Sequence, residues 1–298
     1  MKSSLRSKIF KKILYLRKKS NKIESPDEWK EYFNEKRRIN SEPYKLPNFN
    51  YKSTINYYEM EDMPIYILEP PQMDNDKVII HLHGGGFISK SNNRNWKFLD
   101  RLAVETQQKI IVPLYPLLPD HNFKQAYDKL KKFYTIQLEK HDNENISFCG
   151  YSAGGCLSLG LSLYLKENNI PIPKNIILIS PWLDLRLGNP EIDELEDKDP
   201  LLYKDYLKTL AISWADGEKL DDYRLSPING NIMDLENISI FVGTHDILYP
   251  DTKIFYNKCK SIGKKINYFV FEGLYHNFIA LPIHEINKTL QLIVEVLK

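Results

Sequence analysis

The sequence predicts an α/β fold with a mostly parallel central sheet and helices on both of its faces. Short apolar runs alternate with helical stretches along most of the chain, which favours a parallel sheet. The runs are continuous in Ile, Val, Leu and Phe, which indicates strands covered on both faces. With 298 residues and 42% hydrophobic content, the chain can form one domain, residues 1–298, with a substantial core.

Each expected element follows from its local pattern. Residues 51–60 and 63–68 alternate in polarity and are rich in tyrosine, so they predict an antiparallel pair with Met63-Pro64 near its turn. Parallel strands are expected at 78–82, 110–114, 146–149, 176–180, 238–242 and 266–271. Helices are expected near 96–107, 123–140, 152–168, 251–262 and 284–297.

A serine lies on the turn between one of these strands and the next helix, in Gly150-Tyr151-Ser152-Ala153-Gly154. A turn this tight brings the backbone close to itself, so a Cβ at either glycine would clash with the neighbouring strand and helix. The serine hydroxyl would then point out of the sheet, as a nucleophile requires. The alternative is that Ser152 only caps the helix.

A glycine-rich loop, His83-Gly84-Gly85-Gly86-Phe87, follows the expected strand 78–82. Such a loop can turn its backbone N–H groups toward one point and stabilise the oxyanion that forms when a hydroxyl attacks an acyl carbon. With the residue after the nucleophile, the predicted oxyanion hole is Gly84, Gly85 and Ala153. A flexible turn or a phosphate cradle is the alternative, but the later glycines or the Gly-Lys-Ser/Thr ending of phosphate loops are missing.

These motifs resemble those of the α/β-hydrolase fold, and within it the esterases similar to hormone-sensitive lipase. Residues 114–120, 180–185 and 226–228 are similar to further segments of that family, so the resemblance covers roughly residues 63–298. The sequence departs from the family pattern at Tyr151, where many members have Asp, and at Ile247, where many have Pro after the catalytic acid. Both departures could alter the pocket, but neither removes a group that the chemistry needs.

The predicted base is His276. A serine hydroxyl is a weak nucleophile, so a base must take its proton and an acid must orient that base. The order along α/β-hydrolase chains is serine, acid, histidine, and the histidines after Ser152 are His245, His276 and His284. His276 follows the expected strand 266–271, whereas His284 begins the last helix as a surface residue and His245 adjoins the predicted acid.

The predicted acid is Asp246, in the loop after the expected strand 238–242. Asp184 and Asp251 are its rivals. Asp184 also follows a strand but precedes a long insertion, and Asp251 begins a helix, where the helix dipole favours a negative charge. The predicted catalytic residues are therefore Ser152, Asp246 and His276.

The resemblance implies a helical cap formed by about residues 1–45 and about 185–230. The second segment carries an acidic patch and then three aromatic residues of a predicted helix. The acidic residues are Glu191, Asp193, Glu194, Glu196, Asp197 and Asp199, and the aromatic ones are Tyr203, Tyr206 and Trp214. The aromatic side chains either line the acyl pocket or pack the cap onto the core.

Residues 1–22 are basic, contain no acid, and repeat Leu5, Ile9, Ile13 and Leu16 at helical spacing. Three interpretations stay open: a cap helix whose apolar stripe packs on the domain while its lysines stay solvated, a membrane-docking helix, or a disordered tail. The segment has neither the apolar stretch of a signal peptide nor the length of a transmembrane span.

Composition narrows the function further. The net charge is +2 and the leader carries much of the positive charge, so no broad nucleic-acid footprint remains. The cysteines Cys149, Cys156 and Cys259 are interpreted as core residues of a reducing compartment, and the seven histidines show no metal-ligand spacing. We expect a cytoplasmic enzyme with no cofactor and no metal, with possible peripheral membrane contact through residues 1–22.

The function that these features predict is a serine hydrolase that cleaves carboxylic esters through an acyl-enzyme. The resemblance implies small-molecule ester substrates with short to medium acyl chains. An amidase or peptidase with the same triad is the main alternative. A non-catalytic ligand-binding relative is the other, although such proteins usually lose a member of the triad.

Overall fold

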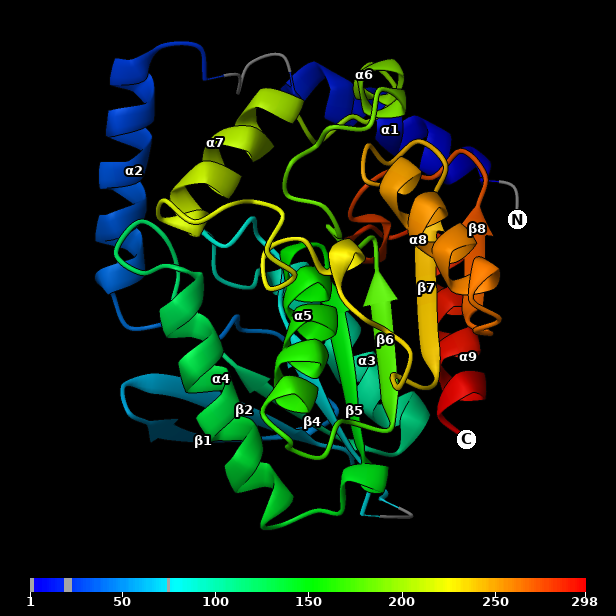
Figure 1. Ribbon diagram of the computed structural model, residues 1–298. Helices are drawn as coiled ribbons and strands as arrows, with labels where there is room; N and C mark the ends of the chain where they lie inside the picture. The colour runs from blue at the N-terminus through cyan, green and yellow to red at the C-terminus, as the bar shows by residue number, and fades with distance from the viewer. Residues whose placement is uncertain (1–2, 19–22, 74–75) are drawn as a thin grey trace.

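The computed structural model describes residues 3–18, 23–73 and 76–298, and an eight-stranded sheet forms its centre (Figure 1). The strands are β1 Thr54–Met60, β2 Met63–Glu69, β3 Val78–Leu82, β4 Lys109–Pro113, β5 Ile146–Tyr151, β6 Asn175–Ile179, β7 Ile238–Gly243 and β8 Asn267–Phe271. Their order across the sheet is β1-β2-β4-β3-β5-β6-β7-β8. The neighbouring strands β4, β3, β5, β6, β7 and β8 pair in parallel, whereas β2 pairs antiparallel with both β1 and β4. This mostly parallel sheet confirms the predicted α/β class.

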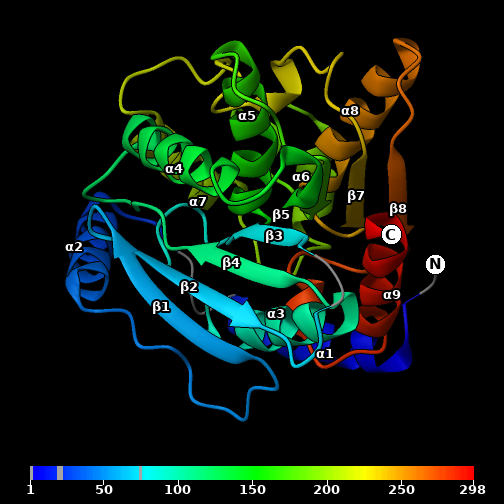
Figure 2. The ribbon, with the colours of Figure 1, turned by 90° about the horizontal axis from the view of Figure 1, so that it is seen from below.

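Helices cover both faces of this sheet. The helices are α1 Leu5–Lys18, α2 Pro26–Ser41, α3 Asn93–Thr106, α4 Phe123–Leu138, α5 Ala153–Glu167, α6 Glu191–Glu196, α7 Lys204–Ala215, α8 Tyr249–Ser261 and α9 Glu285–Leu297. Figure 2 shows α4, α5 and α8 on one face and α3 and α9 on the other. This arrangement is the one that alternating strands and helices predict.

The continuous apolar strands are explained by these two layers. Ile80 and Phe148 belong to the core on the side of α4 and α5, whereas Ile79 and Cys149 belong to the core on the side of α3 and α9. Successive residues of one strand therefore enter opposite cores, and both need apolar side chains. The three cysteines are buried and free.

The hairpin at the edge of the sheet turns at Glu61 and Asp62, directly before Met63-Pro64. Glu61 and Asp62 both have positive φ, 47° and 63°, and Met63 already begins β2. A two-residue hairpin loop whose twist matches its strands needs positive φ at both positions. The prediction of an antiparallel pair with Met63-Pro64 near its turn is therefore confirmed.

Helix α1 is described from Leu5 to Lys18, so the disordered-tail interpretation is wrong for this part of the leader. Residues 1–2 and 19–22 lie outside the described residues. The stripe of Leu5, Ile9, Ile13 and Leu16 faces outward, and the opposite side of the helix packs on the body. The expectation that this stripe packs on the domain while the lysines stay solvated is therefore also wrong.

Candidate active site

Four loops meet at the carboxyl edge of the parallel strands. The glycine-rich loop follows β3, the serine turn follows β5, and the loops that carry Asp246 and His276 follow β7 and β8. In open α/β sheets, ligands bind outside the carboxyl ends of the strands. The topology alone therefore brings together groups that are far apart in the sequence.

The serine turn is strained and closely packed. Ser152 has φ 54° and ψ −119°, a conformation that costs a non-glycine residue about 1–3 kcal/mol. A Cβ on Gly150 would lie 2.2 Å from the carbonyl oxygen of Gly154, and a Cβ on Gly154 would lie 1.9 Å from that of Leu82. Both glycines are needed because the backbones approach too closely for any side chain.

The hydroxyl of Ser152 is used as a hydrogen-bonding partner of a histidine and not as a helix cap. Ser152 occupies the position before α5, but its side chain makes no capping hydrogen bond. Its Oγ instead lies 2.9 Å from Nε2 of His276. The distance is within reach of a proton transfer between hydroxyl and imidazole.

His276 is in turn held by Asp246. Its Nδ1 lies 2.9 Å from Oδ2 of Asp246, and the other carboxylate oxygen accepts the backbone N–H of Leu248. A carboxylate can only accept here, so Nδ1 carries the proton and Nε2 presents a lone pair to Ser152. Ser152, Asp246 and His276 all have buried side chains.

Electrostatics favour a proton on this imidazole. Burial by itself lowers the pKa of His276, but the charge and hydrogen bond of Asp246 and the charge of Asp199 outweigh it and raise the pKa. The two carboxylates would thus stabilise an imidazolium at this position if the serine gave up its proton to it.

The rival acids and bases lie elsewhere. Asp184 forms an ion pair with Arg186 at 2.6 Å, and Asp251, in the first turn of α8, accepts a hydrogen bond from Asn189. Burial and the charge of Asp184 raise the pKa of Asp251 to about 7, so these two carboxylates form a cluster of their own. His284 is exposed before α9, and Nδ1 of His245 lies 2.5 Å from Nζ of Lys11.

The glycine-rich loop lies directly against the serine turn. A Cβ on Gly84 would be 2.8 Å from the carbonyl oxygen of Tyr151, and Gly85 has φ +118°. Among the hydrogen bonds between described residues, none uses the backbone N–H of Gly84, Gly85 or Ala153. Three donors are therefore available close to Ser152.

His83 supports this loop from beneath. It stacks on Tyr115 with ring centroids 4.4 Å apart, and the Tyr115 hydroxyl donates to the His83 carbonyl oxygen. Its own Nδ1 lies 2.7 Å from the carbonyl oxygen of Gly84. Burial lowers the pKa of His83 to about 4, so the ring is neutral near pH 7 and can pack in an apolar surrounding.

Parts of the N-terminus and of the insertion lie over the glycine-rich loop. Trp214 of α7 stacks on Phe87 at 4.7 Å between ring centroids, and a Cβ on Gly86 would meet the side chain of Leu210. Tyr206 of α7 stacks on Trp29 of α2, whereas the Tyr203 hydroxyl donates to the backbone of Lys18. These contacts favour the interpretation that the three aromatic residues of the insertion pack the cap.

Asp199 was predicted only as one member of an acidic patch, and the structure places it beside the triad. It is fully buried, and its carboxylate accepts the backbone N–H groups of Leu201 and Ile247 at 2.8 and 3.2 Å. Burial and the charge of Asp246 raise the pKa of Asp199 to about 6. The available signal was the apolar Pro200-Leu201-Leu202 that follows it, which is a longer apolar run than any beside the other acids of the patch.

The two departures from the family pattern have structural roles. Tyr151 is buried between the glycine-rich loop and His276, with 5.5 Å between its ring centroid and that of the imidazole. Ile247 supplies the N–H that Asp199 accepts, which a proline in that place could not do. The hydrogen bond between Asp199 and the catalytic loop therefore depends on the residue that departs from the family.

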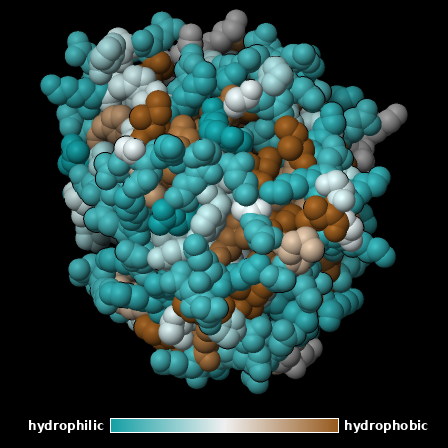
Figure 3. Space-filling view, in the orientation of Figure 1, coloured by the Kyte–Doolittle hydropathy of each residue, from teal (hydrophilic) through white to brown (hydrophobic). Residues whose placement is uncertain are grey.

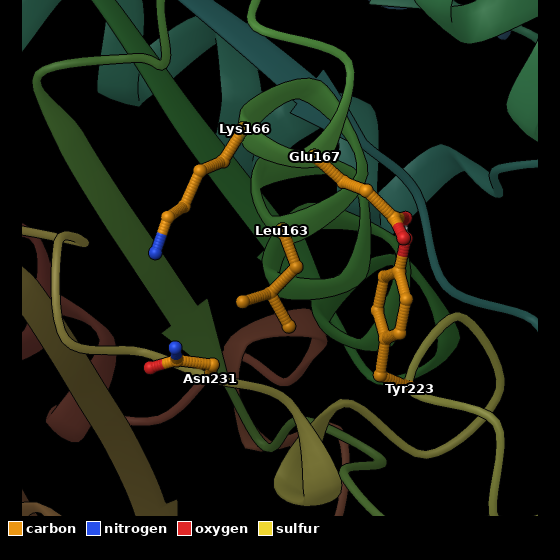
Figure 4. A pocket seen from close by; sticks show the side chains of 5 residues that line it. All are labelled: Leu163, Lys166, Glu167, Tyr223 and Asn231. Atoms are coloured by element: carbon orange, nitrogen blue, oxygen red, sulfur yellow. Dashed lines mark hydrogen bonds between the residues drawn. The ribbon is translucent and has the colours of Figure 1, made fainter.

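A separate hollow of about 250 Å³ lies at the far end of α5, lined by Leu163, Lys166, Glu167, Tyr223 and Asn231 (Figure 4). Tyr223 donates to Glu167, and Lys166 pairs with Asp234. The hollow is about 20 Å along the helix from Ser152. Its polar groups already have partners, so it does not compete with the serine site.

Within the described ranges, no cluster of His, Cys, Asp or Glu could hold a metal ion.

Comparison with known proteins agrees with the α/β-hydrolase fold. Residues 79–280 match a family described as alpha/beta hydrolase fold. An esterase of Acinetobacter venetianus is 31% identical over 209 residues, which cover 70% of this chain and 69% of that protein. The crystal structure of a putative esterase from Staphylococcus aureus superposes with a TM-score of 0.88 at 26% identity, over 92% of this chain and 93% of the other.

A more distant structure extends the likeness over almost the whole chain. A hormone-sensitive lipase from a metagenome library superposes with a TM-score of 0.85 at 20% identity, over 99% of this chain and 98% of that one. At this identity the likeness concerns the fold alone. It includes the N-terminal segment, which lies outside the family match at residues 79–280.

Proposed function

The chain belongs to the α/β-hydrolase fold family as one of its esterase- and lipase-like enzymes, and we propose that it is a serine carboxylesterase with the triad Ser152, His276 and Asp246. One observation carries the proposal: Oγ of Ser152 is 2.9 Å from Nε2 of His276, whose Nδ1 is 2.9 Å from Oδ2 of Asp246. Two hydrogen bonds thus join a nucleophile to a base, and that base to an orienting acid. The names of the esterase relatives support the same reaction class.

The proposed reaction has two steps. Ser152 Oγ attacks the ester carbonyl carbon while its proton passes to Nε2 of His276, and the imidazolium then gives that proton to the leaving alcohol. Water attacks the acyl-enzyme with His276 again as base, which releases the acid and restores the serine. Asp246 keeps the proton on Nδ1 throughout and stabilises the imidazolium.

The backbone N–H groups of Gly84, Gly85 and Ala153 form the proposed oxyanion hole. Their support is the contact between the glycine-rich loop and the serine turn, and the position of Ala153 at the N-terminal end of α5. Each donor in such a site typically lowers the barrier by about 2.7–4 kcal/mol. Peptide donors suit this task because they are already fixed when charge develops on the oxygen.

The cap of the proposed enzyme is formed by about residues 1–45, which carry α1 and α2, and by the insertion of about residues 185–230, which carries α6 and α7. The stacking of Trp214 on Phe87 and the contact of Leu210 with Gly86 place α7 against the glycine-rich loop, where an acyl chain would enter. The resemblance to esterases of the hormone-sensitive lipase group favours esters with short to medium acyl chains. Bulky side chains of α7 above the loop agree with that limit.

The test is a series of p-nitrophenyl esters of increasing acyl length, assayed beside the matching p-nitroanilides. We expect kcat/KM to pass through a maximum at a short or medium chain, with the anilides much slower. Turnover of anilides at rates close to the esters would instead favour the alternative amidase. Tight binding of esters without turnover would favour a non-catalytic ligand-binding protein.

A further inference from the structure

Helix α1 is fixed on the body of the protein by one side only. Phe10 and Leu14 pack against the core beside α9. The polar contacts of the same side join Ser4 to Glu285, Lys11 to His245, Tyr15 to the backbone of Asp197, and Lys18 to the backbone of Asp199. These contacts set the rotation of the helix about its axis, so the opposite side cannot turn inward without breaking them.

The outward side of α1 is an apolar stripe. Leu5, Ile9, Ile13 and Leu16 are 75%, 53%, 45% and 79% exposed. At about 100° per residue, the four side chains lie within about 80° of the helix circumference. The other large apolar side chains that are exposed in the described residues are spread along the chain, namely Ile39, Tyr57, Met73, Ile212, Met233, Ile254 and Ile262. Single exposed residues are ordinary, whereas a continuous row indicates an interaction surface.

Basic side chains border this stripe on both sides. Arg6, Lys8 and Lys12 are exposed, and none of them forms an ion pair with a described residue. Residues 1–22 contain no acid. The acidic helix α6 is near α1 in Figure 1, but its Asp193 and Glu191 are already paired with Lys204 and Lys253.

We propose that α1 docks the protein on a bilayer that contains anionic phospholipids, with the stripe buried at the boundary of headgroups and acyl chains. Arg6, Lys8 and Lys12 would then face lipid phosphates, since a helix with an apolar stripe between basic residues lies in the plane of such a surface. A second copy of the chain fits this surface poorly, because a two-fold contact would set the basic borders of the two helices against each other.

The helix that carries the docking surface packs, by its other side, on the loops of the proposed triad. The backbone of Ser7 accepts a hydrogen bond from the Tyr275 hydroxyl, and Lys11 contacts His245. Tyr275 and His245 directly precede His276 and Asp246 in the chain. Among the helices of the described residues, none is long and apolar enough to cross a bilayer. A bilayer bound by α1 would therefore be held against the side of the protein where these loops lie.

The proposal is tested by flotation of the full-length chain with phosphatidylcholine vesicles, prepared with and without phosphatidylglycerol. We expect flotation with the phosphatidylglycerol vesicles, loss of it at high salt, and little flotation with phosphatidylcholine alone. A variant with Leu5→Ser, Ile9→Ser, Ile13→Ser and Leu16→Ser should bind at least about tenfold more weakly. Its altered side chains are exposed, so the fold should not depend on them.

Two further variants make the result specific. Arg6→Gln with Lys8→Gln and Lys12→Gln should abolish the preference for phosphatidylglycerol, whereas Ile212→Ser with Ile254→Ser, which changes exposed apolar residues of α7 and α8, should float like the unaltered chain. Turnover of a soluble p-nitrophenyl ester should be equal in all variants, which separates docking from the reaction. Flotation of the stripe variant equal to that of the unaltered chain, or a dimer that this variant converts to a monomer, would overturn the proposal.

Discussion

The triad and the outward side of α1 are opposite solutions to the placement of polar and apolar groups. Ser152, His276 and Asp246 are polar and buried, and each has its partner within the chain. On α1, the leucines at 5 and 16 are exposed, while Lys11 and Lys18 are turned toward the body. The available partners decide which side of a helix is buried, since a lysine with acceptors can be held inside and a leucine without an apolar counterpart stays outside.

The two regions also differ in whether their partners lie within the chain. The proposed triad has all its hydrogen-bonding partners within the chain, and the strained serine turn and the two carboxylates are already in place. The apolar stripe of α1, by contrast, remains exposed and is not covered by the described part of the chain. Figure 3 shows the face of the molecule seen in Figure 1, on which hydrophilic side chains predominate and apolar ones form smaller groups between them.

Ser152→Ala should reduce kcat for p-nitrophenyl esters by about 10⁶-fold, because no other group can form the acyl-enzyme. The matched control is Ser162→Ala, which removes another buried hydroxyl of α5 that bonds only the helix backbone. Circular dichroism should be unchanged in both variants. Equal losses in the two variants would mean that the packing of α5, and not the nucleophile, limits activity.

Asp246→Asn should reduce kcat by about 10⁴-fold, because an amide can donate to Nδ1 and so favour the wrong tautomer of His276. Asp251→Asn is the control, since this acid lies in the cluster around Asp184. It should leave kcat within about tenfold of the unaltered protein. A larger loss in Asp251→Asn than in Asp246→Asn would show that Asp246 is not the catalytic acid.

Asp199→Asn should move the acidic limb of kcat/KM to lower pH. The reaction needs neutral His276, whose pKa the charge of Asp199 helps to raise, so removing that charge lowers the pKa of the imidazole. The shift should reach up to about one pH unit. It should be seen above about pH 6, where Asp199 is ionised. Asp197→Asn, an exposed neighbour, should leave the limb in place, and an unchanged limb in both variants would exclude electrostatic control by Asp199.

On α1, Leu14→Ala should lower the free energy of unfolding by about 1–2 kcal/mol, because Leu14 packs on the core beside α9. Leu5→Ser should change it by less than about 0.5 kcal/mol, since this side chain is exposed. Urea unfolding measures both. The reverse ranking would mean that α1 packs in solution by the stripe.

Much of the fold follows from the sequence because its signals are local. Apolar runs such as 78–82 and 238–242 coincide with β3 and β7 within a residue, and the glycine at 150 is required by its contact with Gly154, on the other side of the serine. The loops that carry Ser152, Asp246 and His276 could be assigned to one edge because carboxyl ends of parallel strands share that edge.

The features that could not be predicted from the sequence depend on contacts between distant segments. They are the orientation of α1 and the position of Asp199. Helical periodicity identified an apolar side of α1, but Phe10 and Leu14 on the other side find the core, and only the folded arrangement decides between them. Asp199 resembled its acidic neighbours until the fold placed it beside Asp246. Its contact with the N–H of Ile247 joins residues 48 positions apart.

The most direct test of the triad is covalent labelling of the full-length protein with a fluorophosphonate, followed by peptide mass spectrometry. We predict one adduct, on Ser152, with ester hydrolysis lost in proportion to labelling, and no adduct in Ser152→Ala. Labelling should be greatly slowed in His276→Ala, because the hydroxyl then lacks its base. An adduct on another residue, or full ester hydrolysis by protein labelled at Ser152, would contradict the proposed mechanism.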